Sequence, residues 1–300
     1  MPPRTVTNKL VLVTGAASGI GKATAVAAAG KGARLFLTDI EDARLQAVAA
    51  EIRAGGGSVE LAKALDISDR DAVAAMAEEI HAAHGSVDVV MNIAGIAVWG
   101  TVETLSHDQW RRVIAVNLMG PIHVVECFVP AMIAAGRGGH LVNVSSAAGL
   151  FGLPWHAPYS AAKFGLRGLS EVLRFDLRRH DIGVSLVCPG AVDTGLVNTF
   201  EIAGLDRSSP TIQQFTARFR RHAVTPERAA ARILEGIERN RYWVYTSRDV
   251  RVGHFLQRRF ETLYVLAMQA VNDRFDAIAR KARSAYSERP RSASARSRSQ

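Results

Sequence analysis

The chain has 300 residues, and its hydrophobic and charged fractions, 48% and 22%, are ordinary for a globular protein. This length and composition allow one large α/β domain or two small ones and exclude a disordered, collagen-like or coiled-coil chain. Residues 240–300 carry 13 Lys and Arg against 5 Asp and Glu, so only +1 of the net charge of +9 belongs to residues 1–239. The near-neutral main body argues against a nucleic-acid enzyme.

Apolar runs rich in β-branched residues alternate along the chain with longer Ala- and Leu-rich stretches of helical period. Because the expected strands are apolar throughout, they predict a parallel sheet with helices on both faces. The fold class is therefore a three-layer, doubly wound α/β domain over residues 1–250. We predict strands at residues 10–13, 34–38, 58–64, 87–91, 140–144, 183–187 and 242–245, and helices at 19–31, 41–54, 69–84, 107–135, 157–180 and 226–239.

The C-terminal part departs from this alternation. Residues 195–222 mix Asn, Gly and Pro with apolar residues, and residues 284–300 are rich in Ser and Arg and are expected to be disordered. Residues 251–283 are expected to form an amphipathic helical extension. Its apolar stripe comprises Leu256, Phe260, Leu263, Ala267, Val271, Phe275 and Ile278.

Cysteine usage and hydropathy indicate a cytoplasmic protein. Cys127 and Cys188 lie far apart without a CxxC motif, so neither a disulfide framework nor a metal site is expected. No apolar run approaches the 18 residues that span a bilayer, and residues 1–9 lack the apolar segment of a signal peptide.

A glycine-rich segment, residues 14–21, follows the first predicted strand and opens the first helix. Gly15, Gly19 and Gly21 allow a tight turn that brings the backbone close to a pyrophosphate at the helix N-terminus. Asp39 ends the second strand, where a carboxylate can bind adenosine ribose hydroxyls. A carboxylate there repels a 2′-phosphate and no Arg follows it, so NAD(H) is favoured over NADP(H). The alternative is a plain tight turn with a helix-capping Asp.

Tyr159 and Lys163 lie one turn apart on the same face of a predicted helix. A free tyrosine has a pKa of about 10, and a nearby ammonium, helped by a positively charged nicotinamide, lowers that pKa so that the phenol can exchange a proton near neutrality. Ser146 ends the fifth predicted strand, at the edge of a parallel sheet where ligands bind, and can donate a hydrogen bond to a substrate oxygen. Alone, such a Tyr–Lys pair is more often a solvated helix face.

Taken in order, these motifs resemble the short-chain dehydrogenase/reductase family over residues 8–245. Residues 92–95 match its NNAG turn with Ile93 in place of the second Asn, Asn117 falls where the family carries a catalytic Asn, and residues 189–194 match its PGxVxT segment. The resemblance implies a Rossmann fold that binds its nicotinamide cofactor through Gly15, Ser18, Gly19, Ile20, Gly21, Asp39, Asp66, Asn92, Ala94, Gly95, Tyr159, Lys163, Pro189, Gly190, Val192 and Thr194.

The resemblance also implies the reaction, which is hydride transfer between NAD(H) and a secondary alcohol or ketone. In that mechanism Tyr159 is the acid or base, and Lys163 lowers its pKa and binds the nicotinamide ribose. Ser146 polarises the substrate oxygen, while Asn117 fixes a water that relays protons.

The segments that line the substrate site in this family, including a lid at residues 195–222, are mostly apolar here. Phe151, Trp155 and Leu196 are the expected pocket residues, and residues 96–99, 150–156 and 195–202 offer no Arg or Lys to an acid or phosphate. A lipophilic alcohol or ketone, of the steroid, retinoid or long-chain type, is therefore favoured. The alternatives are a lid that packs on the core around a small ketone, a reductase of sugars or acyl thioesters, and a regulator that binds the dinucleotide without turnover.

The helical extension can close over the pocket, join a subunit interface or lie on an anionic bilayer. We favour packing on the same or a neighbouring subunit, because a single apolar stripe needs only one partner. A homodimer or homotetramer is expected, with weak peripheral membrane contact as the alternative role of the extension and no specific nucleic-acid binding.

Overall fold

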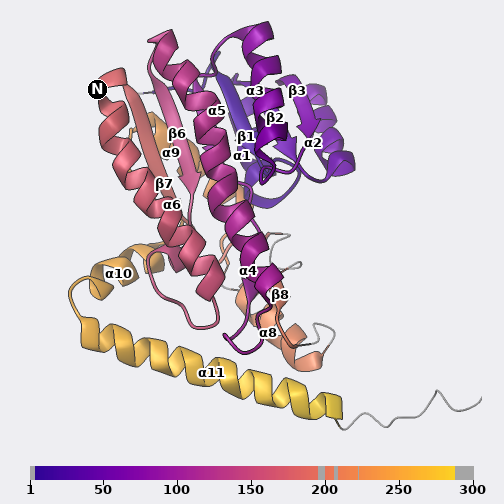
Figure 1. The fold of residues 1–300 in the computed structure, drawn as a ribbon, viewed down its shortest axis with the longest axis vertical. Coiled ribbons are helices and arrows are strands. Elements are labelled where there is room, and N and C mark those ends of the chain that lie inside the picture. The colour runs from indigo at the N-terminus through magenta and orange to yellow at the C-terminus, as the bar shows by residue number, and fades with distance from the viewer. Residues whose placement is uncertain (1–3, 195–199, 206–208, 222, 288–300) are drawn as a thin grey trace, which may run out of the picture.

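Seven parallel strands form one sheet in the order β3-β2-β1-β4-β6-β7-β9, with helices on both faces (Figure 1). The computed structural model describes residues 4–194, 200–205, 209–221 and 223–287. The strand order runs outward in one direction from β1 to β3 and in the other from β4 to β9. This confirms the predicted doubly wound α/β fold.

The strands of the sheet are β1 (Leu10–Thr14), β2 (Arg34–Asp39), β3 (Ser58–Ala64), β4 (Val89–Asn92), β6 (Gly139–Val144), β7 (Ile182–Cys188) and β9 (Trp243–Tyr245). The α-helices are α1 (Gly19–Ala29), α2 (Asp42–Ala54), α3 (Arg70–His84), α4 (His107–Ile114), α5 (Gly120–Ala135), α6 (Ala157–Asp176), α8 (Pro210–Arg221), α9 (Pro226–Glu238), α10 (Arg248–Gln257) and α11 (Glu261–Ser287). Two short strands, β5 (Val98–Trp99) and β8 (Glu201–Ile202), pair in a small separate sheet. Short 3₁₀ helices cover Ala147–Gly149 and Leu177–His180, and a π-helical turn covers Ala115–Met119.

Alternate residues of each central strand point to opposite faces of the sheet, and both faces are covered. In β1, Val11 packs in the apolar layer formed with α1, α2 and α9, whereas Leu12 packs in the layer formed with α3 and α5. Both side chains are fully buried. Burial on both faces explains why the strands read as continuous apolar runs.

The predicted helix over residues 107–135 is interrupted by the π-helical turn. An unbroken α-helix would need the N–H of residue 121 to donate to the carbonyl of Asn117, and Pro121 has no N–H. The run has the length and apolar composition of a membrane span. Here, however, Val124 and Phe128 are fully buried in the layer that α5 forms with α3 and the sheet.

The helical extension forms two helices rather than one continuous stripe. In α10, Val250 and His254 are buried towards the body, which turns Leu256 outward. In α11, the second half packs on the body through Phe275, Ile278 and Ala282. Leu256, Phe260, Leu263 and Ala267 are exposed, so the first part of the predicted stripe does not pack on the same chain, and its packing on a neighbouring subunit stays a prediction.

Candidate functional site

The candidate site lies at the carboxyl ends of the central strands, where the strand order reverses between β1 and β4. The glycine-rich turn after β1 is packed so tightly that side chains cannot replace its hydrogens. A Cβ on Gly15, whose φ is +69°, would lie 2.7 Å from Ala94 Cα, and one on Gly21 would lie 1.9 Å from the carbonyl oxygen of Gly15. Gly19, with φ +52°, packs against the Thr194 side chain, from which an added Cβ would lie 3.0 Å away.

Two side chains fix this turn to the neighbouring strands. The Asp39 carboxylate, at the end of β2, accepts a hydrogen bond from the backbone N–H of Ala17 at 2.9 Å. The Thr14 hydroxyl accepts from the backbone N–H groups of Ile93 and Ala94 at 3.0 and 3.1 Å. Because residue 93 contributes its backbone, the Ile93 side chain leaves this link intact.

A buried chain of polar side chains, which the sequence analysis did not identify, supports the turn after β4. Asn92 donates to the Asn143 side chain at 2.9 Å, and Asn143 donates to the Ser170 hydroxyl at 2.9 Å. It connects β4, β6 and α6 below the site. The available signal was one amide, Asn143, in the otherwise apolar run of residues 141–144.

Asn117 and Lys163 converge on Gly95. Asn117 accepts a hydrogen bond from the Ile96 N–H at 2.9 Å and donates one to the Ile96 carbonyl at 2.8 Å. A Cβ added to Gly95 would lie 2.8 Å from Asn117 Oδ1 and 3.5 Å from Lys163 Nζ. The π-helical turn thus places a fully buried amide within a few ångströms of the lysine.

The end of β6 holds the first turn of α6 in position. Lys163 Nζ donates to the Val144 carbonyl at 3.0 Å, and the buried Ser145 hydroxyl donates to the Lys163 carbonyl at 2.9 Å. Ser146 is extended, and its hydroxyl accepts from the Ala148 N–H at 3.1 Å and shares a hydrogen bond with Tyr159. Of the two adjacent serines, Ser146 therefore faces the tyrosine and Ser145 anchors the helix.

Burial dominates the electrostatics of the Tyr–Lys pair. It lowers the pKa of Lys163 to about 8 and raises the pKa of Tyr159. The hydrogen bond between Tyr159 and Ser146 lowers the pKa of Tyr159 by a smaller amount. The ammonium lies 5.7 Å from the centre of the tyrosine ring, where it is held by the Val144 carbonyl. Desolvation penalises the Tyr159 phenolate more than its hydrogen bond to Ser146 favours it, and the lowering of its pKa by Lys163 and a positively charged nicotinamide stays a prediction.

The remaining expected cofactor residues fall on three segments. The Pro189 carbonyl accepts from the Ala147 N–H at 2.7 Å, so residues 189–194 run from the serine segment to Thr194 beside Gly19. Within them, Gly190 lies against Val250, and Val192 pairs with Val224 in an isolated β-bridge. Ser18 and Ile20 belong to the start of α1. Asp66 follows β3, where its carboxylate accepts from the N–H and hydroxyl of Ser68, both at 2.8 Å.

A cluster of aromatic side chains lies beside Tyr159. The His156 ring lies 6.3 Å from the Tyr159 ring and 4.4 Å from Trp99, and Trp155 lies 5.8 Å from Phe275 of α11. Phe200 and Phe215 complete this aromatic cluster through Trp99. The cluster joins segments from β5, α8 and α11, of which α8 lies within the lid predicted at residues 195–222 and α11 belongs to the predicted helical extension.

The three expected pocket residues lie in different surroundings. Trp155 belongs to the aromatic cluster, adopts φ +66°, and has an indole N–H that is buried without a hydrogen-bond partner among the described residues. Phe151 instead packs against the main core and beneath Gly253 of α10. Leu196 lies outside the described residues.

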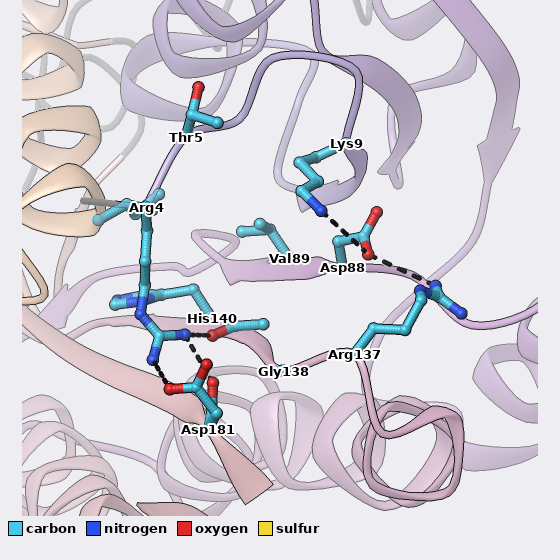
Figure 2. Close-up of a pocket in the computed structure, with 11 residues that line it drawn as sticks. Arg4, Thr5, Lys9, Asp88, Val89, Arg137, Gly138, His140 and Asp181 are labelled. Atoms are coloured by element: carbon cyan, nitrogen blue, oxygen red, sulfur yellow. Dashed lines mark hydrogen bonds and ion pairs between the residues drawn. The ribbon is translucent and has the colours of Figure 1, made fainter. Parts of the chain in front are cut away.

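A separate cavity of about 260 Å³ lies at the opposite, amino edge of the sheet (Figure 2). Its charges are paired: Asp88 contacts Arg137 at 3.4 Å and Lys9 at 3.9 Å, and Arg4 contacts Asp181 at 2.8 Å. These ion pairs tie the strand starts together. The cavity contains none of the residues that converge on Gly95.

Comparison with known proteins gives a consistent picture. The profile of the short chain dehydrogenase family matches residues 9–203. The chain is 37% identical over 236 residues to the probable oxidoreductase EphD of Mycobacterium tuberculosis. The matched region covers 77% of this chain but only 40% of the length of EphD.

Two solved structures have the same fold. A short-chain dehydrogenase/reductase from Burkholderia phymatum in complex with NAD superimposes with a TM-score of 0.79 at 30% identity, covering 87% of this chain and 96% of that one. A metagenomic short-chain oxidoreductase in complex with NADP gives a TM-score of 0.64 at 34% identity, covering 81% and 96%.

Proposed function

The chain belongs to the short-chain dehydrogenase family, and we propose that it transfers a hydride between NAD(H) and a lipophilic secondary alcohol or its ketone. Membership makes it an oxidoreductase. The observation that carries the proposal is the grouping of four side chains at the edge of the sheet where this fold binds ligands: Asn117 and Lys163 meet beside Gly95, Lys163 lies 5.7 Å from the Tyr159 ring, and Tyr159 is hydrogen-bonded to Ser146.

The residues present fit a nicotinamide dinucleotide. The N-terminus of α1, where Gly15, Gly19 and Gly21 carry no side chains of their own, would hold the pyrophosphate, and Asp39 would hold the adenosine ribose. When bound, the dinucleotide supplies the hydride donor or acceptor. Between the two forms we propose NAD(H), because the Asp39 carboxylate would repel the 2′-phosphate of NADP(H).

Tyr159 would exchange a proton with the substrate oxygen, and Ser146 would hold that oxygen by a hydrogen bond as charge develops on it. Burial raises the pKa of Tyr159, so its phenol is a proton donor near neutrality, which suits ketone reduction. Lys163, with a pKa of about 8, stays largely protonated at pH 7 and would favour the phenolate once the proton has left. Asn117, hydrogen-bonded to Ile96 on both amide atoms, would keep the lysine side of the site in place.

The aromatic cluster beside Tyr159 supports a lipophilic substrate. Trp99, Trp155 and Phe275 present apolar surface there, and His156 is neutral because burial lowers its pKa to about 4. The unpartnered indole N–H of Trp155 is a hydrogen-bond donor that a substrate oxygen could use. Such surroundings favour a ring-containing alcohol over a sugar or an acyl thioester.

We also propose that the protein assembles through α6. Its outward side exposes Phe164, Val172 and Phe175, at 38%, 59% and 64% of their maximum area. An apolar stripe of this kind on an otherwise packed helix indicates a subunit contact.

The test is a panel of secondary alcohols assayed by cofactor reduction, with NAD and NADP in parallel. We expect the highest kcat/KM with NAD and lipophilic ring-containing alcohols. Tyr159→Phe should lose at least about a hundredfold in kcat while it keeps its affinity for NAD, since only the transferable proton is removed.

Two results would favour the alternatives. Tight NAD binding without turnover of any alcohol or ketone would indicate a dinucleotide-binding regulator. A preference for sugars or acyl thioesters would leave the reaction class standing and overturn the substrate class.

A further inference from the structure

The corner formed by α10 and the first half of α11 carries exposed apolar side chains. Figure 1 shows it at the periphery of the molecule, beyond the sheet and its covering helices. Within residues 252–266 the exposed large apolar side chains include Val252, Phe255, Leu256, Phe260, Leu263 and Leu266, most of them more than half exposed. Such a concentration of exposed apolar residues marks a contact surface.

Arginines surround these side chains. A groove of about 1190 Å³ runs between α9, β9 and α10 and is lined by arginines from α9, from α10 and from the residues that flank β9 and α10. Arg232 and Arg241 are paired with Glu235. Among the described residues, no ion pair is formed by Arg228, Arg248, Arg251, Arg258 or Arg259.

The arginines and the apolar residues share one face of α10. Val250 and His254 point to the body, the opposite side of the helix presents Arg248, Val252 and Phe255, and Arg251 lies on the flank between them. Arg259, just after the helix, lies over the Phe255 ring at 6.0 Å. This is the pattern of a helix that lies in the plane of a membrane surface, with apolar side chains below and cations at the level of the phosphates.

We propose that the corner comprising α10 and residues 261–266 of α11 docks on an anionic phospholipid bilayer. A second copy of the chain fits less well, because a twofold contact would place the same unpaired arginines opposite each other. A nucleic acid would neutralise the arginines but gives Leu263 and Leu266 nothing to bury against. A bilayer satisfies both features, as phosphate groups pair with the arginines and acyl chains receive the apolar side chains.

The proposed membrane docking is independent of the proposed function, and the experiment that tests it needs no substrate. The full-length protein is sedimented with vesicles of phosphatidylcholine alone and of phosphatidylcholine with phosphatidylglycerol. We expect binding to the anionic vesicles, little to the neutral ones, and a decrease as salt rises.

Charge and apolar contributions are tested separately. Arg251→Glu/Arg259→Glu should weaken vesicle binding at least about tenfold, whereas Arg111→Glu/Arg178→Glu, with the same change in net charge elsewhere, should not. Leu263→Ser/Leu266→Ser should also weaken it, whereas Ile40→Ser/Val102→Ser, which changes other exposed apolar side chains, should not.

Several results would overturn the proposal. One is an equal loss of vesicle binding in the control variants. Another is binding of the protein to duplex DNA but not to vesicles. A third is a change of oligomeric state in Leu263→Ser/Leu266→Ser, which would assign the face to contact with a second copy of the chain. If a variant fails to fold, hydrogen exchange of the wild-type protein decides instead. Vesicles should then slow exchange in α10 and the first turns of α11, and unchanged exchange there would refute docking.

Discussion

Gly95 is the residue on which the geometry of the site depends most directly. The amide of Asn117 and the ammonium of Lys163 approach it from the π-helical turn and from α6, and the lack of a side chain lets both reach their positions. Gly95→Ala would place a methyl group 2.8 Å from Asn117 Oδ1, closer than van der Waals contact allows. One or both side chains must then shift.

We expect Gly95→Ala to lower kcat by about 10- to 100-fold, because misplacing catalytic groups by about 1 Å has effects of this size. The matched control is Gly55→Ala at the exposed end of α2, where an added Cβ would meet only carbonyl oxygens at 3.5 Å, an ordinary contact distance. That control should keep kcat and the melting temperature. A Gly95→Ala enzyme with wild-type kcat would show that the two side chains are not positioned through this contact.

Asp39 is the residue that decides between the two cofactors. Its carboxylate is fixed above the glycine-rich turn by the Ala17 N–H, and the next residue, Ile40, is 65% exposed, so that an arginine can be introduced there without being buried. Asp39→Ala/Ile40→Arg should shift the ratio of kcat/KM for NADP over NAD by about 10- to 100-fold, through lost repulsion and a new charge-assisted hydrogen bond. A wild-type enzyme that already prefers NADP over NAD would contradict the assignment of NAD(H) as the cofactor.

At the scale of elements, α11 connects the C-terminal extension to the candidate site. Its Phe275 ring contacts Trp155 at 5.8 Å, Phe215 at 5.8 Å and His156 at 6.4 Å. Phe275→Ala should therefore lower the free energy of unfolding by about 1–2 kcal/mol, less than a fully buried Phe would cost, and raise KM for a lipophilic substrate.

The control for this prediction is Phe255→Ala in α10, where the ring is 60% exposed. It should change stability by less than about 0.5 kcal/mol. Urea unfolding of both variants at one protein concentration measures the difference. Equal effects would mean that α11 does not stabilise the body through its second half.

The regular elements of this fold were predictable because their signals are local. The strands of the large sheet begin and end within two residues of the predicted positions, since continuous apolar runs bounded by turns mark buried parallel strands. Glycine spacing likewise located the turn that holds Gly15 against Ala94. The relation of Tyr159 to Lys163 follows from helical geometry alone.

The parts that were missed depend on contacts between distant segments. The two-residue strands β5 and β8 exist only through their mutual pairing, and neither has a period of its own. The stripe across residues 256–278 was read as one face, whereas the chain turns between α10 and α11, and this turn exposes Phe260 and Leu263. The role of Asn143 could not be predicted, because it depends on the position of β6 between the side chains of Asn92 in β4 and Ser170 in α6.

At the scale of the whole molecule, buried histidines link the fold to pH. His140, at the amino edge of the sheet, has a pKa lowered to about 3 by burial and by the charge of Arg4, and burial lowers that of His156, near the site, to about 4. Both are 6% exposed or less. The unfolded chain titrates at the ordinary value of 6.5, so below that pH it binds protons that the folded protein excludes.

The contribution of the two histidines to the free energy of unfolding should therefore be fully present above pH 6.5. It should fall as the pH drops towards 4, by about 1 kcal/mol per pH unit for each histidine. Glu60, whose pKa is lowered to about 2 by its hydrogen bond to Arg34, adds a further loss of stability only below its ordinary value of 4.5. The window between pH 6.5 and 4.5 therefore reports on the histidines.

His156→Phe keeps a ring beside Trp99, 4.4 Å away in the wild type, and removes one titrating group. The free energy of unfolding of this variant, measured in urea, should therefore fall less steeply between pH 7 and 5 than that of the wild type. His107→Phe, at an exposed position of α4, should retain the wild-type slope. If His156→Phe and the wild type lose stability in parallel across this window, the buried imidazole at position 156 is not a source of the acid sensitivity.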